Sequence, residues 1–162
     1  LREMGVKITE YDDALRVQRT GLLRRANVKT LPYPGFPTDM QPQIAVCMAL
    51  AEGTSLVTEG IYDNRFRYTA ELNRRGASIQ VESKTAVIDG VEQLHGCEVR
   101  ACDLRAGAAM VIAALSAEGT TTIEDAHYIE RGYEDIIGKF SSIGGNIRRV
   151  ETFESSSQSA AG

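Results

Sequence analysis

The sequence contains an internal repeat, and this feature constrains the fold more than any other. The segment from Asp39 to Val81 can be laid over the segment from Asp103 to Val150 in the same order. The matching positions are an opening aspartate (Asp39, Asp103), an Ala-Glu-Gly-Thr run (51–54, 117–120), an arginine (Arg65, Arg131) and a Gly-x-x-Ile pattern (76–79, 144–147). We therefore expect two copies of one supersecondary unit that stack and share a core.

Each copy is predicted to contain helix, strand, helix and strand in that order. In the first copy these elements cover 40–51, 55–58, about 66–75 and 78–81, and in the second copy 104–117, 121–123, 133–143 and 146–150. Alternation of helices and strands predicts an α/β protein. A single domain over residues 1–152 is expected, with units at about 39–81 and 103–150.

The segments outside the two copies give further expectations. Residues 1–8 resemble the closing helix, glycine and strand of a copy, which indicates a third unit without its first half. Between the units we expect two strand pairs, 15–17 with 28–30 and 86–88 with 98–100. The tail 153–162 is rich in Ser and Ala and is predicted to be disordered.

Composition excludes several classes of function. The net charge of −4 gives no general attraction to nucleic acid or to an anionic membrane. No apolar stretch approaches the length of a membrane span and no signal peptide is present, so a cytoplasmic location is predicted. Cys47, Cys97 and Cys102 form no Cys-x-x-Cys pair and have no clustered histidines, which predicts reduced thiols and no metal site.

Asp39 is a candidate base because a proline-rich loop presents it at the first turn of a helix. Pro32, Pro34 and Pro37 restrict the backbone of this loop, so the carboxylate has little conformational freedom to lose. The positive end of the helix dipole favours the charged form. The alternative is an aspartate that only complements the dipole.

Three arginines occupy related positions in the two copies. Arg65 and Arg131 both lie at the junction from a strand to the second helix, and Arg105 follows Asp103 at the start of the second copy. Guanidinium groups near helix N-termini can form a site for phosphate or carboxylate. For any single arginine, the alternative is a solvated surface position. The Ala-Glu-Gly-Thr runs lack the spacing of a phosphate loop and are interpreted as helix ends.

Four segments together resemble the UDP-N-acetylglucosamine enolpyruvyl transferases. They are Pro-Gly-Phe-Pro-Thr-Asp-Met-Gln (34–41), Asn-Arg-Phe (64–66), Asp-Leu-Arg-Ala (103–106) and Arg-Gly-Tyr (131–133), and the resemblance covers residues 1 to about 150. It implies an inside-out α/β barrel of repeated βαβ-type units, here truncated at its first unit. It also implies transfer of the enolpyruvyl group of phosphoenolpyruvate to the 3-hydroxyl of UDP-N-acetylglucosamine, without a cofactor.

The resemblance also implies roles for single residues. Asp39 matches the carboxylate that contacts the sugar hydroxyl and is proposed to deprotonate it, and Ile61 matches a substrate-contacting backbone position. Arg131 matches an arginine that binds phosphoenolpyruvate. The charged residues expected to line the same cleft are Arg65, Asp103 and Arg105.

In the family, a second domain supplies a loop cysteine, a second arginine and further UDP-sugar contacts. None of these is found in this chain, and neither is an early lysine that contacts phosphoenolpyruvate. Cys47 and Cys102 are interpreted as core thiols, so the chain alone is expected to be inactive and to need the second domain of the same parent chain. The alternatives are the related shikimate-phosphate enzyme and a non-catalytic domain that binds a nucleotide sugar or regulates a partner.

Overall fold

The computed structural model describes residues 1–151, and the predicted tail 153–162 lies outside the described residues. Its first repeat unit begins with β3 (Asn27–Lys29), η1 (Thr38–Met40), α1 (Gln41–Ala49) and β4 (Thr54–Thr58). β3 and β4 pair in parallel, and α1 forms the crossover between them. Next come η2 (Arg65–Arg67), α2 (Tyr68–Arg74), β5 (Ser78–Glu82) and β6 (Thr85–Asp89), completing a sheet of order β3-β4-β6-β5.

The second unit repeats this βαβ geometry. β8 (Glu98–Arg100) and β10 (Thr122–Glu124) pair in parallel, and α3 (Leu104–Leu115) connects them. The short strands β7 (Leu94–His95) and β9 (Ala117–Glu118) also pair in parallel. α4 (His127–Glu130) and α5 (Ile136–Ser142) follow where the first unit has η2 and α2. The two segments that resemble each other in sequence thus share the βαβ arrangement, and the structural likeness extends upstream to β3 and β8.

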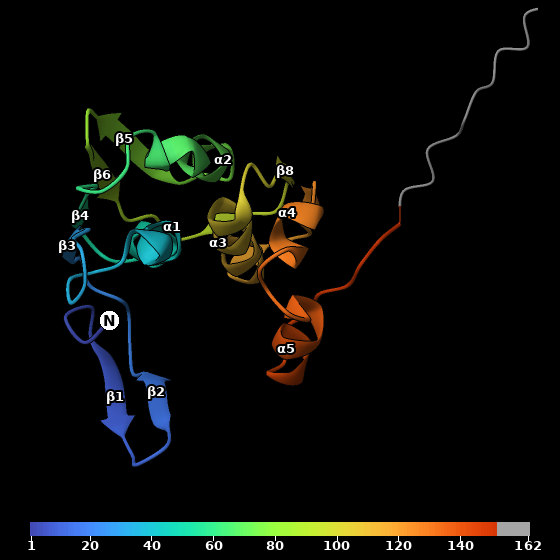
Figure 1. The fold of residues 1–162 in the computed structure, drawn as a ribbon, viewed down its shortest axis with the longest axis horizontal. Coiled ribbons are helices and arrows are strands. Elements are labelled where there is room, and N and C mark those ends of the chain that lie inside the picture. The colour runs from blue at the N-terminus through green and yellow to red at the C-terminus, as the bar shows by residue number, and fades with distance from the viewer. Residues whose placement is uncertain (152–162) are drawn as a thin grey trace, which may run out of the picture.

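The N-terminal residues carry the end of a further copy. Gly5, Gly76 and Gly144 have φ angles of 89°, 94° and 95° at equivalent positions. β1 (Val6–Glu10) follows Gly5 as β5 follows Gly76, and it forms a hairpin with β2 (Leu15–Arg19). This hairpin extends away from the body of the molecule (Figure 1). The partial third unit expected from the sequence is thus visible in the backbone.

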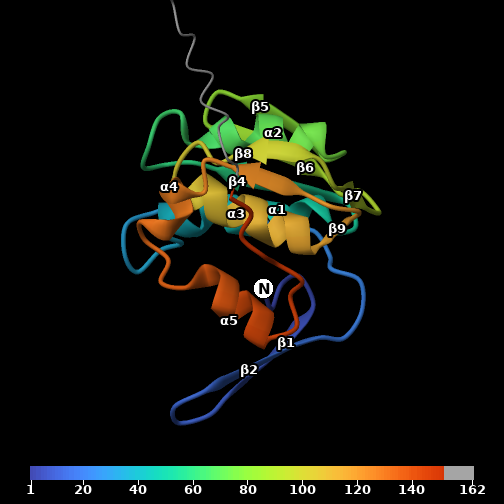
Figure 2. The ribbon, with the colours of Figure 1, turned by 90° about the vertical axis from the view of Figure 1, so that its right-hand side faces the viewer.

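The helices α1 and α3 pack against one another in the middle of the molecule (Figures 1 and 2). All residues of α1 except Cys47 are buried, so it is enclosed on nearly all sides. On α3, small residues and one methionine at helical spacing join the same core cluster: Ala106, Ala109, Met110 and Ala113. The central position of α1 and α3 agrees with the predicted inside-out arrangement, whereas α5 has no buried residue and lies at the periphery (Figure 1).

Both strand pairs expected between the units are wrong. β2 pairs with β1 and β3 pairs with β4, while β6 lies between β4 and β5 and β8 pairs with β10. The reason is the connections. β1 and β2, and likewise β5 and β6, are joined by short turns that favour hairpins, with Ser83 at a φ of 56° in the second turn. The parallel pairs β3–β4, β7–β9 and β8–β10 each span a helix, and β4 also pairs with β6 in the antiparallel sense.

The predicted strand over 146–150 is also absent, and these residues have no regular structure. Its equivalent in the first unit, β5, is paired along its whole length with β6. Among residues 1–151 no strand pairs with 146–150. A strand sequence without a partner leaves its backbone groups to water.

Close packing of α3 in the core can be tested by overfilling it. Ala109 is fully buried, so Ala109→Leu should lower the free energy of unfolding by about 1–3 kcal/mol, because a well-packed core has no space for the added atoms. Urea unfolding followed by circular dichroism measures this. The control Ala70→Leu, at an exposed position of α2, should change stability by less than about 0.5 kcal/mol. Equal stability of both variants would contradict the packing.

Candidate active site

A surface cavity of about 260 Å³ lies where the two repeat units meet. The residues that line it come from the segment before α2 and from the start of α3: Tyr62, Asp63, Asn64, Arg65, Asp103 and Arg105. Three of the residues predicted from sequence, Arg65, Asp103 and Arg105, are therefore together in one cavity. Their convergence depends on the packing of the two units.

Asp39 and Arg105 form an ion pair that joins the units. Asp39 lies in η1, directly before α1, and its Oδ1 accepts a hydrogen bond from Nε of Arg105 in the first turn of α3. The pKa of Asp39 is held below its ordinary value, mainly by this hydrogen bond and further by the charges of Arg105 and Arg65, against a smaller opposing effect of burial. Asp39 is therefore an ionised acceptor at neutral pH.

Asp103 has a structural function in addition to its place in the cavity. It is the N-cap of α3, and its Oδ1 accepts hydrogen bonds from the N–H groups of Arg105 and Ala106, both at 2.8 Å. Such a cap satisfies backbone donors that have no partner inside the helix. Asp103 therefore fixes the start of α3, and with it the backbone that carries Arg105.

Arg65 begins the short helix η2 in front of α2. Its Nε donates to Oγ1 of Thr38 at 3.2 Å, and its Cζ lies 4.6 Å from the centre of the Tyr62 ring. Across residues 1–151 its two Nη groups have no recorded hydrogen-bond partner, so they can bind a carboxylate or a phosphate. The predicted anion-binding chemistry fits this arginine.

Arg131 lies between β10 and α5, at the strand-to-helix junction that the repeat predicted, but not at the start of a helix. It follows α4 as the C-cap and is exposed, whereas α5 begins only at Ile136. The expectation of an arginine at a helix start is therefore wrong for Arg131, because the second unit has a short extra helix at this point. Arg131 does not line the cavity that contains Arg65 and Arg105. Ile61 is 40% exposed and lies directly before Tyr62 of that cavity.

Two residues of the site, Thr38 and Glu59, were not predicted from the sequence. Glu59 is almost completely buried at the end of β4 and accepts hydrogen bonds from Thr30, Thr38 and the backbone of residues 61 and 62. The signal was available in the repeat. By the strand registers, Asp125 occupies the place equivalent to Glu59, so an acidic residue follows the parallel strand in both copies.

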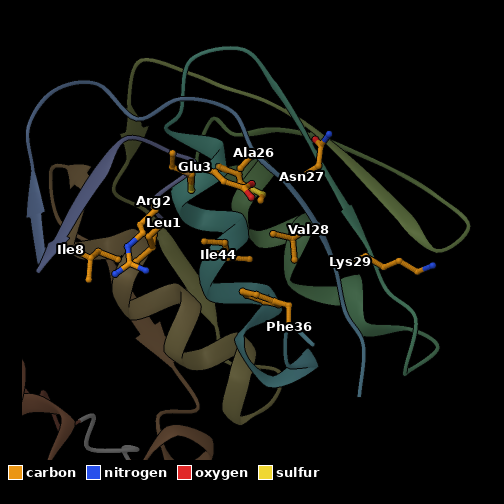
Figure 3. Close-up of a pocket in the computed structure, with 12 residues that line it drawn as sticks. Leu1, Arg2, Glu3, Ile8, Ala26, Asn27, Val28, Lys29, Phe36 and Ile44 are labelled. Carbon is orange, nitrogen blue, oxygen red and sulfur yellow. The ribbon is translucent and has the colours of Figure 1, made fainter. Parts of the chain in front are cut away.

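A second and larger cavity, of about 480 Å³, lies between the N-terminal segment, β3 and α1 (Figure 3). Apolar side chains such as Val28, Phe36 and Ile44 form much of its lining, and the charged Arg2, Glu3 and Lys29 also contribute to it. Helix α2 of the first unit packs on α3 of the second unit. By the repeat, the position beside α1 that corresponds to α2 is the position of this cavity. The cavity is thus accounted for by the repeat architecture.

The cysteines are not part of the cavity. Cys47, Cys97 and Cys102 are free, half-buried and packed against the core. Burial raises the pKa of both Cys47 and Cys102, and the charge of Asp103 adds to this for Cys102, so neither is a reactive thiolate at neutral pH. No cluster of three or more His, Cys, Asp or Glu residues suited to a metal occurs in the described part of the chain. Nor is any helix there long and apolar enough to span a membrane.

A family model described as EPSP synthase (3-phosphoshikimate 1-carboxyvinyltransferase) matches residues 1–140. The chain belongs to the EPSP synthase family. The fold is shared with the enolpyruvyl transferase NikO of Streptomyces tendae, which is 31% identical with a TM-score of 0.83 over 91% of this chain and 34% of that one. An EPSP synthase of Acinetobacter baumannii, at 19% identity and a TM-score of 0.61, covers 82% of this chain and 34% of its own.

Sequence relatives carry a more specific name. A protein of Caldanaerobacter subterraneus named UDP-N-acetylglucosamine 1-carboxyvinyltransferase 3 is 55% identical over 93% of this chain. A protein of the same name from Symbiobacterium thermophilum is 52% identical over 91% of it. The chain spans only 36% and 35% of the length of these two relatives. Most of each relative therefore has no counterpart in this chain.

The ion pair between Asp39 and Arg105 predicts a titration behaviour. The NMR midpoint of the Asp39 carboxyl carbon should lie below the ordinary value of 3.8, and Arg105→Gln should raise it because the strongest stabilising contact of the carboxylate is lost. Arg100→Gln, which removes a guanidinium paired with Glu124 instead, is the control and should leave Asp39 unchanged.

The lowered pKa of Asp39 also fixes the direction in which pH changes the stability of the fold. A carboxyl with a lower pKa in the folded than in the unfolded state stabilises the fold above the unfolded pKa. This contribution is lost as the pH falls through the folded pKa of Asp39. An unchanged Asp39 midpoint in Arg105→Gln would contradict the ion pair in solution.

Proposed function

We propose that this chain forms one side of the active site of a UDP-N-acetylglucosamine 1-carboxyvinyltransferase. This enzyme would transfer the enolpyruvyl group of phosphoenolpyruvate to the 3-hydroxyl of UDP-N-acetylglucosamine, the first committed step of peptidoglycan synthesis. The observation that carries the proposal is that Arg65 and Arg105, from two repeat units, line one cavity and that Asp39 forms an ion pair with Arg105. The names of the relatives at 52–55% identity support the choice of substrates.

In this proposal Asp39 is the base. It would accept the proton of the sugar 3-hydroxyl as that oxygen adds to C2 of phosphoenolpyruvate and C3 takes up a proton, and loss of a C3 proton together with inorganic phosphate would then restore the double bond. Its ionised state fits a proton acceptor, and among residues 1–151 no group donates to its Oδ2. Because Arg105 holds Oδ1, a ligand anion that draws this arginine away would make Asp39 a stronger base.

The other residues would bind substrate. Arg65 and Arg105 would hold anionic groups in the cavity, and Arg131 would bind phosphoenolpyruvate from its own exposed position. The backbone of Ile61 would contact the UDP-sugar, and Asp103 would hold the start of α3. The remaining part of the site would come from the second domain of the same parent protein, and the sequence predicts that this protein is cytoplasmic.

Two other functions are less well supported. The shikimate-phosphate enzyme shares the fold, but the solved EPSP synthases are only 19–20% identical to this chain. A non-catalytic domain that binds a nucleotide sugar would not need an ionised Asp39 between two arginines. Kinetics with both acceptor substrates separate these possibilities.

A grafted enzyme, in which this chain replaces the segment that it matches in the Caldanaerobacter relative, tests the proposal. It should release phosphate from phosphoenolpyruvate with UDP-N-acetylglucosamine and not with shikimate 3-phosphate. Asp39→Ala in the graft should lower kcat by about 10²–10⁴-fold, because a positioned base typically contributes this much. Phosphate release is followed by a colorimetric assay.

Two controls accompany this measurement. Asp13→Ala, at an exposed turn between β1 and β2, should leave kcat unchanged. The isolated chain should release no phosphate above background, because it spans only 36% of the length of the Caldanaerobacter relative. Near-normal turnover of the Asp39→Ala graft would exclude Asp39 as the base, and turnover by the isolated chain would disprove the need for a second domain.

A further inference from the structure

Glu59 is a buried carboxylate to which the proposed function gives no role. It is 1% exposed, and no lysine or arginine in residues 1–151 forms an ion pair with it. Four hydrogen bonds compensate its burial instead. Oε1 accepts from the Thr30 hydroxyl at 2.7 Å and from the N–H groups of Ile61 and Tyr62 at 2.9 and 3.1 Å, and Oε2 accepts from the Thr38 hydroxyl at 3.0 Å.

The donors to Glu59 belong to three separate segments that build the candidate site. Thr30 directly follows β3, Thr38 directly precedes Asp39, and Ile61 and Tyr62 lead into the segment that carries Arg65. A further hydrogen bond, from Gly60 N–H to Oγ1 of Thr30 at 2.8 Å, closes the connection between the first and third segments. One carboxylate therefore fixes the relative positions of all three.

Arg65 is linked to Glu59 by two routes. In the first, Thr38 donates its hydroxyl hydrogen to Glu59 and accepts the Nε–H of Arg65. In the second, Glu59 holds the backbone of Tyr62, and the Tyr62 ring lies under the Arg65 guanidinium. The Nε edge of Arg65 is thus fixed, and its Nη groups are left for a ligand.

The charge of Glu59 matters for this arrangement. Burial raises the pKa of Glu59, but the hydrogen bonds that it accepts outweigh this effect and hold its pKa below the ordinary value. The carboxylate therefore stays ionised at neutral pH. Hydrogen bonds to an ionised acceptor are about twice as strong as those between neutral groups, so an ionised Glu59 holds its donors more firmly than an amide would.

We propose that Glu59 is a positioning residue, which holds Arg65 and residues 61–62 in register with Asp39 through Thr38 and Tyr62 without touching substrate itself. This inference rests on the proposed function for its catalytic meaning. The hydrogen-bond network that it requires can be tested independently of any activity.

The variants are chosen to break one link at a time. Glu59→Gln keeps Oε1 as acceptor for the loop but replaces Oε2 by an amide that cannot accept the Thr38 hydroxyl hydrogen. Thr38→Val removes both the hydrogen bond that Thr38 donates to Glu59 and the one that it accepts from Arg65. Thr38→Ser keeps the hydroxyl and therefore both bonds. Asp125→Asn is the matched control, because Asp125 is the equivalent acid of the second unit and is exposed.

The first measurement uses the ¹⁵N-labelled chain and follows hydrogen exchange at Nε of Arg65 by NMR. Exchange should be about 10-fold faster in Glu59→Gln and Thr38→Val, since one hydrogen bond is worth up to about that factor. Thr38→Ser and Asp125→Asn should match the original chain. Amide signals of α1 and α3 serve as the check that each variant is folded.

The second measurement is the kinetics of the grafted enzyme. Glu59→Gln and Thr38→Val should each lower kcat/KM for UDP-N-acetylglucosamine by about 10-fold, and Thr38→Ser should recover it. If Glu59 acts through Thr38, the double variant should be no worse than Thr38→Val alone. If the losses of kcat/KM in the two single variants add up in the double variant, Glu59 acts by another route, and the link through Thr38 is overturned.

The outcomes separate the two proposals. Unchanged Arg65 exchange in folded Glu59→Gln and Thr38→Val overturns the positioning role, whatever the enzyme does. Faster exchange with unchanged kinetics overturns it as well, because the network would then be structural only. If the unmodified graft shows no turnover, the proposed function fails, and the exchange measurement still decides whether Glu59 holds Arg65.

Discussion

The packing of α1 against α3 is the contact on which both the fold and the candidate site depend. These two helices belong to different repeat units, and their buried sides form much of the core. Small residues on α3, such as Ala106, Ala109 and Ala113, let the helices approach closely. Asp39 directly precedes α1 and Arg105 lies in the first turn of α3, so the packing of these helices brings Asp39 next to Arg105. A change in this helix pair would therefore alter stability and the site together.

The electrostatics of the site follow from that placement. Asp39 and Arg105 neutralise each other across the unit boundary, and Arg65 is held nearby through the uncharged Thr38. Glu59 adds a second negative charge below this surface, compensated by hydrogen bonds and not by a cation. The result is a cavity whose two arginines keep donors available for an anion while the carboxylate beside them stays ionised. The proposed function uses both features, since the arginines would bind an anion and the carboxylate would accept a proton.

The sequence predicted the parts of the structure that local patterns encode. Helix α1, helix α3 and the glycine turns follow from helical periodicity and from residues that tolerate a positive φ, so their positions were correct. Strand partners were wrong, because a strand sequence such as 86–88 does not specify its neighbour in the sheet. Asp39, Arg65 and Arg105 were found through the repeat and the family resemblance. Glu59 was missed because its hydrogen bonds come from donors distant in sequence, and Arg131 is separated from the start of α5 because the short helix α4 was not predicted.

The most direct test of the account is to titrate the ¹⁵N-labelled 162-residue chain with UDP-N-acetylglucosamine and map the NMR shift changes. We expect weak, saturable binding with changes at the backbone amides of Asp39, Ile61 and Tyr62 and at Nε of Arg65. Amides of the β1–β2 hairpin should stay unchanged. Changes confined to the larger cavity, at Val28 and Ile44, or no saturable change at any of these groups, would contradict the assignment of the site.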